Sequence, residues 1–126
     1  MMIPKFLLRK LYVKGSLKNI DTSGDGTPDS VSFQIKNTLA NGTVIGVEYI
    51  KIDDSEIPLD SIEVILDDKT IKLSEVTPEN SFPIKVRATS TWIIKEKTLD
   101  AGEHKLDISI KTKEAGKLTF DVKDSI

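Results

Sequence analysis

Apolar and polar residues alternate along most of this chain. In several segments every second side chain is apolar, and the side chains between them are charged or polar. Because successive side chains of a β-strand point to opposite faces of a sheet, this period of two predicts strands with one buried face. The predicted strands lie in residues 7–17, 31–35, 62–66, 71–73, 106–110 and 118–122.

Short turn signals separate these segments. They are built from Asp, Asn and Gly, which adopt the backbone conformations of tight turns, and each is short enough to join neighbouring strands antiparallel. The turn signals are Asn41–Gly42, Asp53–Asp54, 67–69, 100–102 and 114–116. Apolar residues at helical spacing do not extend over a dozen positions, and the best helical candidate is a single turn near Leu73, before Pro78.

These elements predict an all-β domain. A one-sided sheet of this size would leave its apolar face in water, so we expect an antiparallel β-sandwich with at most one short helical turn. The pattern does not choose between jelly-roll and immunoglobulin-like connectivity. Pro58 and Pro83 lie within segments whose residue pattern resembles that of a strand, so edge strands or kinks are expected there. Residues 1–126 are expected to form a single domain.

Composition and charge narrow the expected surroundings of the chain. It has 126 residues, of which 38% are apolar and 30% charged, with a formal net charge of -2. Charges of both signs are mixed, so neither a nucleic-acid groove nor a basic membrane patch is predicted. The chain has no cysteine, and its first residues lack a secretion signal, so a cytoplasmic location is expected.

Most of the candidate metal-ligating residues of the chain lie in the segment 20–29, IDTSGDGTPD. Counted from Asp21, oxygen ligands fall at the positions that a calcium-binding loop uses, with Gly26 at the sharp turn. The candidate calcium ligands are Asp21, Ser23, Asp25, the carbonyl of Thr27, and Asp29. The segment resembles the calcium loops of dockerin and thrombospondin type 3 repeats, although Ser32 stands where an EF-hand has its bidentate Glu. The alternative is a metal-free loop, in which Asp, Ser and Gly supply only turn geometry.

Other residues with candidate chemistry are isolated. His104 is the only histidine, and a single imidazole favours a surface or strand-end role over a general base or metal ligand. Trp92, the only tryptophan, is expected in the core. Adjacent carboxylates such as Asp53 and Asp54 are expected to face water rather than act as a glycosidase pair.

Two segments of the second half carry a family resemblance. Residues 57–64, IPLDSIEV, and 99–110, LDAGEHKLDISI, with Trp92 between them, resemble the small all-β subunits of C-glycoside deglycosidases and their uncharacterised relatives. Gly102, Glu103 and His104 match the turn of that family. The resemblance implies a non-catalytic subunit that pairs with a metal-dependent barrel subunit acting on glycosides. The acidic loop at residues 21–29 and the N-terminal segment depart from that family.

The sequence therefore predicts a non-catalytic accessory subunit or binding module rather than an enzyme. Its partner is expected to be a hetero-subunit or a second copy of the chain, with a carbohydrate or glycoside as ligand. The alternative function is a stand-alone, calcium-stabilised ligand-binding or adhesion module. A hydrolase that uses His104 is a third hypothesis, although the residue types show no convergent catalytic set.

Overall fold

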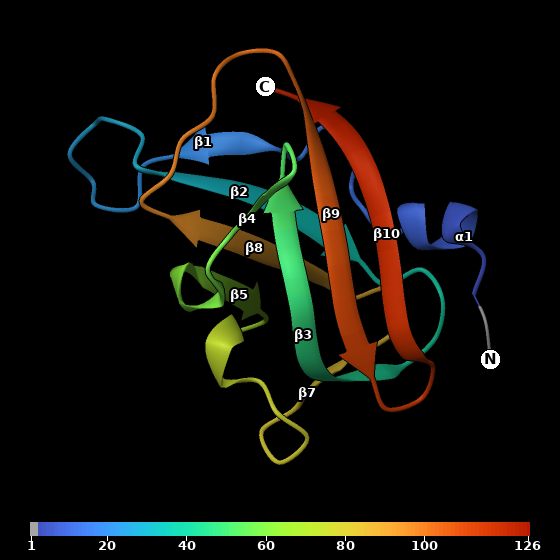
Figure 1. Cartoon of the computed structure of the whole chain (residues 1–126). Coiled ribbons are helices and arrows are strands. Elements are labelled where there is room, and N and C mark those ends of the chain that lie inside the picture. Colours follow the sequence, from blue (N-terminus) through green and yellow to red (C-terminus); the bar gives the residue numbers. More distant parts are fainter. Residues whose placement is uncertain (1–2) are drawn as a thin grey trace.

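Two antiparallel sheets pack face to face in the computed structural model, which describes residues 3–126 (Figure 1). The first sheet has the order β1 (Lys18–Ile20), β2 (Ser30–Lys36), β8 (Thr89–Lys95), β5 (Ile62–Leu66) and β6 (Lys69–Lys72). The second has the order β10 (Gly116–Ser125), β9 (Glu103–Thr112), β3 (Gly42–Ile52) and β4 (Ser55–Glu56), and β7 (Phe82–Ile84) also pairs with β3. The predicted all-β sandwich is confirmed.

The alternating pattern explains why these segments are strands. In β5, Ile62, Val64 and Leu66 are buried, while the residues between them are more exposed. The same inward set appears in β9 and β10, where Leu106 pairs with Val122 and Ile108 pairs with Phe120. The inward residues of both sheets form one continuous core, which is the arrangement that a two-layer sandwich requires.

Consecutive strands often lie in different sheets. The chain leaves the first sheet after β2, returns to it at β5, leaves it again for β7 and returns at β8. As a result β8, late in the sequence, is inserted between β2 and β5, and β3 lies between β9 and β4. The two long strands β9 and β10 form a hairpin at one edge of the second sheet (Figure 1).

The N-terminal segment differs from its prediction. A strand over residues 7–17 was expected, but α1 (Lys5–Arg9) is a helix and only Tyr12 forms an isolated bridge, to Ile35 of β2. Pro4 immediately precedes the helix, at a position that suits its fixed φ angle. Leu8 and Leu11 are three positions apart, so both can be buried on one side of a helical turn. The spacing of these apolar residues is therefore compatible with a helix as well as with a strand.

The predicted turns at Asp53–Asp54, 67–69 and 114–116 lie in hairpins, whereas Asn41–Gly42 and 100–102 lie in connections that cross between the two sheets. Asp53 and Asp54 have φ angles of 51° and 68° and join β3 to β4, as expected for a tight hairpin turn. Pro83 lies in the short strand β7, and Pro58 precedes the 3₁₀ turn η1 (Leu59–Ser61). The expected helical turn near Leu73 is η2 (Leu73–Glu75), also a 3₁₀ turn.

Candidate functional site

The acidic loop between β1 and β2 is held by its own hydrogen bonds. Asp21 accepts bonds from the backbone N–H groups of Gly24 at 2.8 Å and Gly26 at 2.7 Å, and from Ser23 at 3.2 Å. The bond from Gly26, followed by those from Gly24 and Ser23, lowers the pKa of Asp21. Gly24 and Gly26 have positive φ angles of 80° and 89°, which glycine adopts without strain.

Asp29 closes the other side of this loop. Its carboxylate accepts bonds from the hydroxyl and the backbone N–H of Thr22, at 2.7 and 3.1 Å, and from the N–H of Ser23 at 3.1 Å. The bonds from Thr22 hold the pKa of Asp29 far below its usual range. Asp25 accepts one bond, from the N–H of Thr27 at 2.9 Å.

The five predicted calcium ligands thus share one exposed loop, but their carboxylates do not converge. Within residues 3–126, no three Asp, Glu or His side chains lie close enough together to hold a metal ion. The carboxylates of Asp21 and Asp29 are used to order the backbone. Calcium binding here stays a prediction.

His104 lies at the start of β9, where its ring is surrounded by acceptors. Nδ1 lies 2.6 Å from a carboxylate oxygen of Asp53, and Nε2 lies 2.7 Å from the backbone carbonyl of Asp100. Both nitrogens can satisfy these acceptors only when the imidazole is protonated. The carbonyl of Asp100 and the carboxylate of Asp53 accordingly raise the pKa of His104. This geometry supports a structural role that ties the β3–β4 turn to the entry of β9.

Trp92 lies in the core, with only 1% of its surface exposed. Its ring stacks on Phe33 with centroids 5.9 Å apart, and its indole Nε1 donates to the hydroxyl of Ser90 at 2.9 Å. That hydroxyl donates to the carbonyl of Ile35 at 3.2 Å. The indole N–H is therefore satisfied, and the ring borders a hollow between the sheets.

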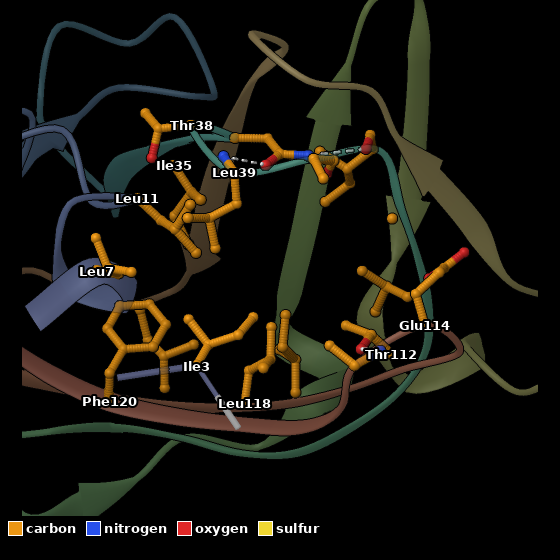
Figure 2. Close-up of a pocket in the computed structure, with 18 of the residues that line it drawn as sticks. Ile3, Leu7, Leu11, Ile35, Thr38, Leu39, Thr112, Glu114, Leu118 and Phe120 are labelled. Carbon is orange, nitrogen blue, oxygen red and sulfur yellow. Dashed lines mark hydrogen bonds between the residues drawn. The ribbon is translucent and has the colours of Figure 1, made fainter. Parts of the chain in front are cut away.

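That hollow is an apolar cavity of about 440 Å³. It is lined by β2 and β8 of the first sheet, by β3, β7, β9 and β10 of the second, and by the connection between β2 and β3. The helix α1 reaches its border. Figure 2 shows Leu11, Ile35 and Leu39 facing Ile3, Leu118 and Phe120 across it. We call it the apolar cavity. Its volume falls in the range of about 300–1,000 Å³ typical of small-molecule sites.

The N-terminal segment covers one side of this cavity. Arg9 of α1 donates to the carbonyl of Asp121 at 2.9 Å and to its carboxylate at 3.0 Å. This places the helix beside the edge strand β10 (Figure 1). Ile3, Pro4 and Leu7 contribute apolar surface to the cavity from this segment.

A buried carboxylate fixes the continuation of this segment. Asp124, 6% exposed, accepts bonds from the hydroxyl of Tyr12 at 2.7 Å and from the N–H groups of Gly15 at 2.9 Å and Leu17 at 3.2 Å. Burial alone would raise the pKa of Asp124, but these bonds and one from the N–H of Ser125 hold it below its usual value. Asp124 therefore stays ionised and joins residues 12–17 to β10.

Polar groups are sparse around the cavity. Glu114, in the β9–β10 turn, accepts bonds from the N–H of Thr43 at 2.7 Å and from its hydroxyl at 2.9 Å. These bonds link that turn to the start of β3. Asn37, which is buried, donates to the carbonyls of Ala40 and Ile84 at 2.7 and 3.0 Å. Among the described lining residues, Glu114 is the only one with a charged side chain.

No helix in the described part of the chain is long and apolar enough to cross a bilayer.

The architecture and the cavity define the class of this protein: an all-β sandwich domain with an apolar hollow that is partly open to solvent. Residues 7–126 match the family described as hydroxymethylglutaryl-CoA reductase, N-terminal domain. Because this match covers nearly the whole chain, the chain belongs to that family. No match was found among curated proteins.

The family match corrects the predicted resemblance. Assignment to the C-glycoside deglycosidase β-subunit family is wrong, because the chain matches the reductase N-terminal domain family instead. Gly102 has a φ angle of 126° and leads into β9. The sequence Gly102–His104 therefore corresponds to a turn followed by a strand with alternating apolar residues. Many sandwiches contain that combination. The predicted barrel partner and glycoside ligand rested on this resemblance.

Sequence reasoning missed the apolar cavity and the role of Asp124. The cavity has no motif, because its lining comes from strands that are far apart in the sequence. Asp124 is a buried acidic residue at an inward position of β10, but its partners are more than 100 positions away. The short N-terminal helix could have been found from Pro4 followed by Leu8 and Leu11.

Proposed function

We propose that this chain is a non-catalytic binding module whose apolar cavity takes a small apolar molecule. The observation that carries the proposal is the cavity itself, about 440 Å³ and bordered mainly by aliphatic and aromatic side chains. An apolar cavity of roughly 150 Å³ is enough to hold benzene. This one has room for a larger hydrocarbon group.

The arrangement of titratable groups supports binding rather than turnover. His104 lies outside the cavity lining, and both of its ring nitrogens are engaged by acceptors. Glu114 is the one charged side chain among the described lining residues, and it is bonded to Thr43. A catalytic centre normally combines several convergent acid, base or nucleophilic groups.

The ligand proposed here differs from the substrate named in the family description. A CoA thioester carries several phosphate charges, and burying them requires cationic partners. The described lining of the cavity supplies no lysine or arginine. The cavity is therefore proposed as a site for an apolar molecule other than the CoA substrate.

The test is a titration with N-phenylnaphthylamine, a neutral dye whose emission rises in apolar surroundings. We expect saturable binding of one dye per chain. We also expect a change in the emission of Trp92, because Trp92 is the only tryptophan and borders the cavity. Absence of saturable binding would count against the proposal.

A filling variant with a matched control locates the dye. Leu39 lines the cavity, whereas Leu59 packs against the same core from outside it. Leu39→Phe adds volume at the site and is expected to weaken binding roughly tenfold or more. Leu59→Phe makes the same chemical change elsewhere and should leave binding unaltered. Equal binding by the two variants would place the dye outside the cavity.

The family match favours a second candidate function. We propose that the sandwich serves as an accessory domain for a hydroxymethylglutaryl-CoA reductase catalytic domain, because its family is described as the N-terminal domain of that enzyme. Size-exclusion chromatography of the chain with the reductase of the same cell tests this. Co-elution with a changed KM or kcat is expected, and separate elution with unchanged kinetics would contradict it.

A further inference from the structure

The charge of the cavity lining restricts the ligand further. We infer that the molecule bound in the apolar cavity carries no negative charge and that its polar end is a hydrogen-bond donor, such as an alcohol or an amine. This inference rests on the proposed ligand-binding function. It concerns the chemistry of the polar end, which the volume of the cavity does not determine.

Glu114, an exposed residue that borders the cavity, can accept a hydrogen bond from a ligand. Glu114 uses one carboxylate oxygen for the N–H of Thr43 and the other for the Thr43 hydroxyl. An ionised carboxylate offers about four lone-pair positions, so two bonds leave acceptor capacity for a ligand. The N–H and then the hydroxyl of Thr43 lower the pKa of Glu114, which keeps it ionised at neutral pH. A hydroxyl or ammonium group would complement this acceptor.

Asn37 and Thr112, two other polar residues that border the cavity, already use their hydrogen-bond donors. The side-chain amide of Asn37 donates to two carbonyls, and its oxygen accepts from the N–H of Leu39 at 3.1 Å. The hydroxyl of Thr112 donates to the carbonyl of Gly116 at 2.9 Å. The donors of these two side chains are therefore occupied. Thr38 and Asn41, which are exposed and also border the cavity, are neutral.

A negative charge on the polar end of the ligand would cost free energy beside Glu114. Glu114 is exposed, so an end group beside it keeps part of its hydration. The part that is lost costs a carboxylate without a cationic partner more solvation free energy than it costs a hydroxyl. Repulsion from Glu114 adds to that cost. A fatty acid and an alcohol of equal length would bury the same hydrocarbon surface in the cavity, so their difference in affinity reports on the polar end alone.

The nearest competing arrangement lies outside the cavity. A second hollow between α1 and β10 shares Ile3, Pro4 and Leu118 with it and is also lined by Lys5 and Lys117. Lys117, however, forms an ion pair with Glu48 at 3.0 Å, and Lys5 lies near the carboxylate of Asp121, whose pKa it helps to lower. An anionic end at this hollow would compete with that pair. The geometry favours the donor end at Glu114.

The experiment compares three ligands with the same hydrocarbon chain: decanol, decylammonium and decanoate. Each displaces N-phenylnaphthylamine from the wild-type chain below the concentration at which the ligand forms micelles. We expect decanol and decylammonium to bind and decanoate to bind on the order of tenfold more weakly. Failure of all three to bind would overturn the proposed function. Binding of decanoate as tight as that of the other two would leave the function standing and overturn this inference.

A charge-removing variant checks the assigned acceptor. Glu114→Gln keeps the size of the side chain and removes its charge, so it should narrow the preference for decylammonium over decanoate. Glu103→Gln makes the same change at an exposed position of β9 outside the lining and should leave the preference unchanged. An unaltered preference in Glu114→Gln would refute the assignment of Glu114.

Discussion

Asp124 offers the sharpest test of how the N-terminal segment is held over the sandwich. In Asp124→Asn the shape of the side chain is kept, but the charged acceptor for Tyr12, Gly15 and Leu17 is lost. A hydrogen bond to a charged group contributes about 1.5–3 kcal/mol, and one to a neutral group about 0.5–1.5 kcal/mol. A difference of about 1 kcal/mol for each of these three bonds gives an expected loss of about 3 kcal/mol.

The same strand supplies a matched control. Asp121 also joins β10 to the N-terminal segment, but its ion pair with Arg9 is exposed, with side-chain exposures of 32% and 48%. Exposed ion pairs contribute about 0–1 kcal/mol, so Asp121→Asn should have a small effect. Urea unfolding with linear extrapolation measures both variants. Equal free energies of unfolding for the two variants would refute the assigned role of Asp124.

The dependence on pH supplies a second check on Asp124. Its pKa is lowered in the folded state, so its contribution to stability is present above the ordinary Asp pKa. That contribution is lost as the pH falls through the lowered pKa. The stability difference between wild type and Asp124→Asn should therefore shrink in acid, and a constant difference across the acid range would contradict the argument.

Two further predictions concern the loops. The pKa of His104 is raised, so its bonds to Asp53 and Asp100 should stabilise the fold fully below the ordinary His pKa. This contribution should be lost as the pH rises through the raised pKa. Thermal melting at a series of pH values should therefore show the stability difference between wild type and His104→Gln closing in alkali, and a difference independent of pH would contradict this. Asp21→Ala removes an acceptor of three backbone N–H groups and Asp25→Ala an acceptor of one, so the first should lower the melting temperature more. Calorimetric titration of the wild-type chain with millimolar calcium tests the predicted metal site, which requires measurable heat that Asp25→Ala abolishes.

The alternation of apolar residues predicted strands at β2, β5, β6, β9 and β10, whereas β1, β3, β4, β7 and β8 were not among the predicted segments. The β9–β10 hairpin follows directly from the sequence, because Glu114–Gly116 turns the chain and the inward residues then pair in register. Asp53 and Asp54 likewise mark the β3–β4 turn. These elements depend on neighbouring residues, so local rules determine them.

The order of the strands could not be predicted in the same way. The position of β8 between β2 and β5 depends on contacts such as Phe33 with Trp92 and Val64 with Trp92. These pairs join residues that are far apart in the chain. Periodicity reports which face of a strand is buried, and it carries no information about the neighbour that buries it.

The candidate site shows the same limit. The acidic loop was conspicuous because its residues are consecutive, yet Asp21 and Asp29 are occupied with backbone N–H groups. The apolar cavity left no such signal, because Ile35, Trp92 and Leu118 are ordinary core residues in the sequence. A cavity is a failure of side chains to fill space, and only their placement in three dimensions reveals it.

The existence of an apolar, accessible hollow is the claim on which the proposed function depends, and xenon tests it directly. Xenon enters dry apolar cavities of sufficient size. A crystal of this chain pressurised with xenon should show the gas bound between Ile35, Ile108 and Leu118. Side chains of the two sheets in mutual contact at that position, with no xenon between them, would contradict the account.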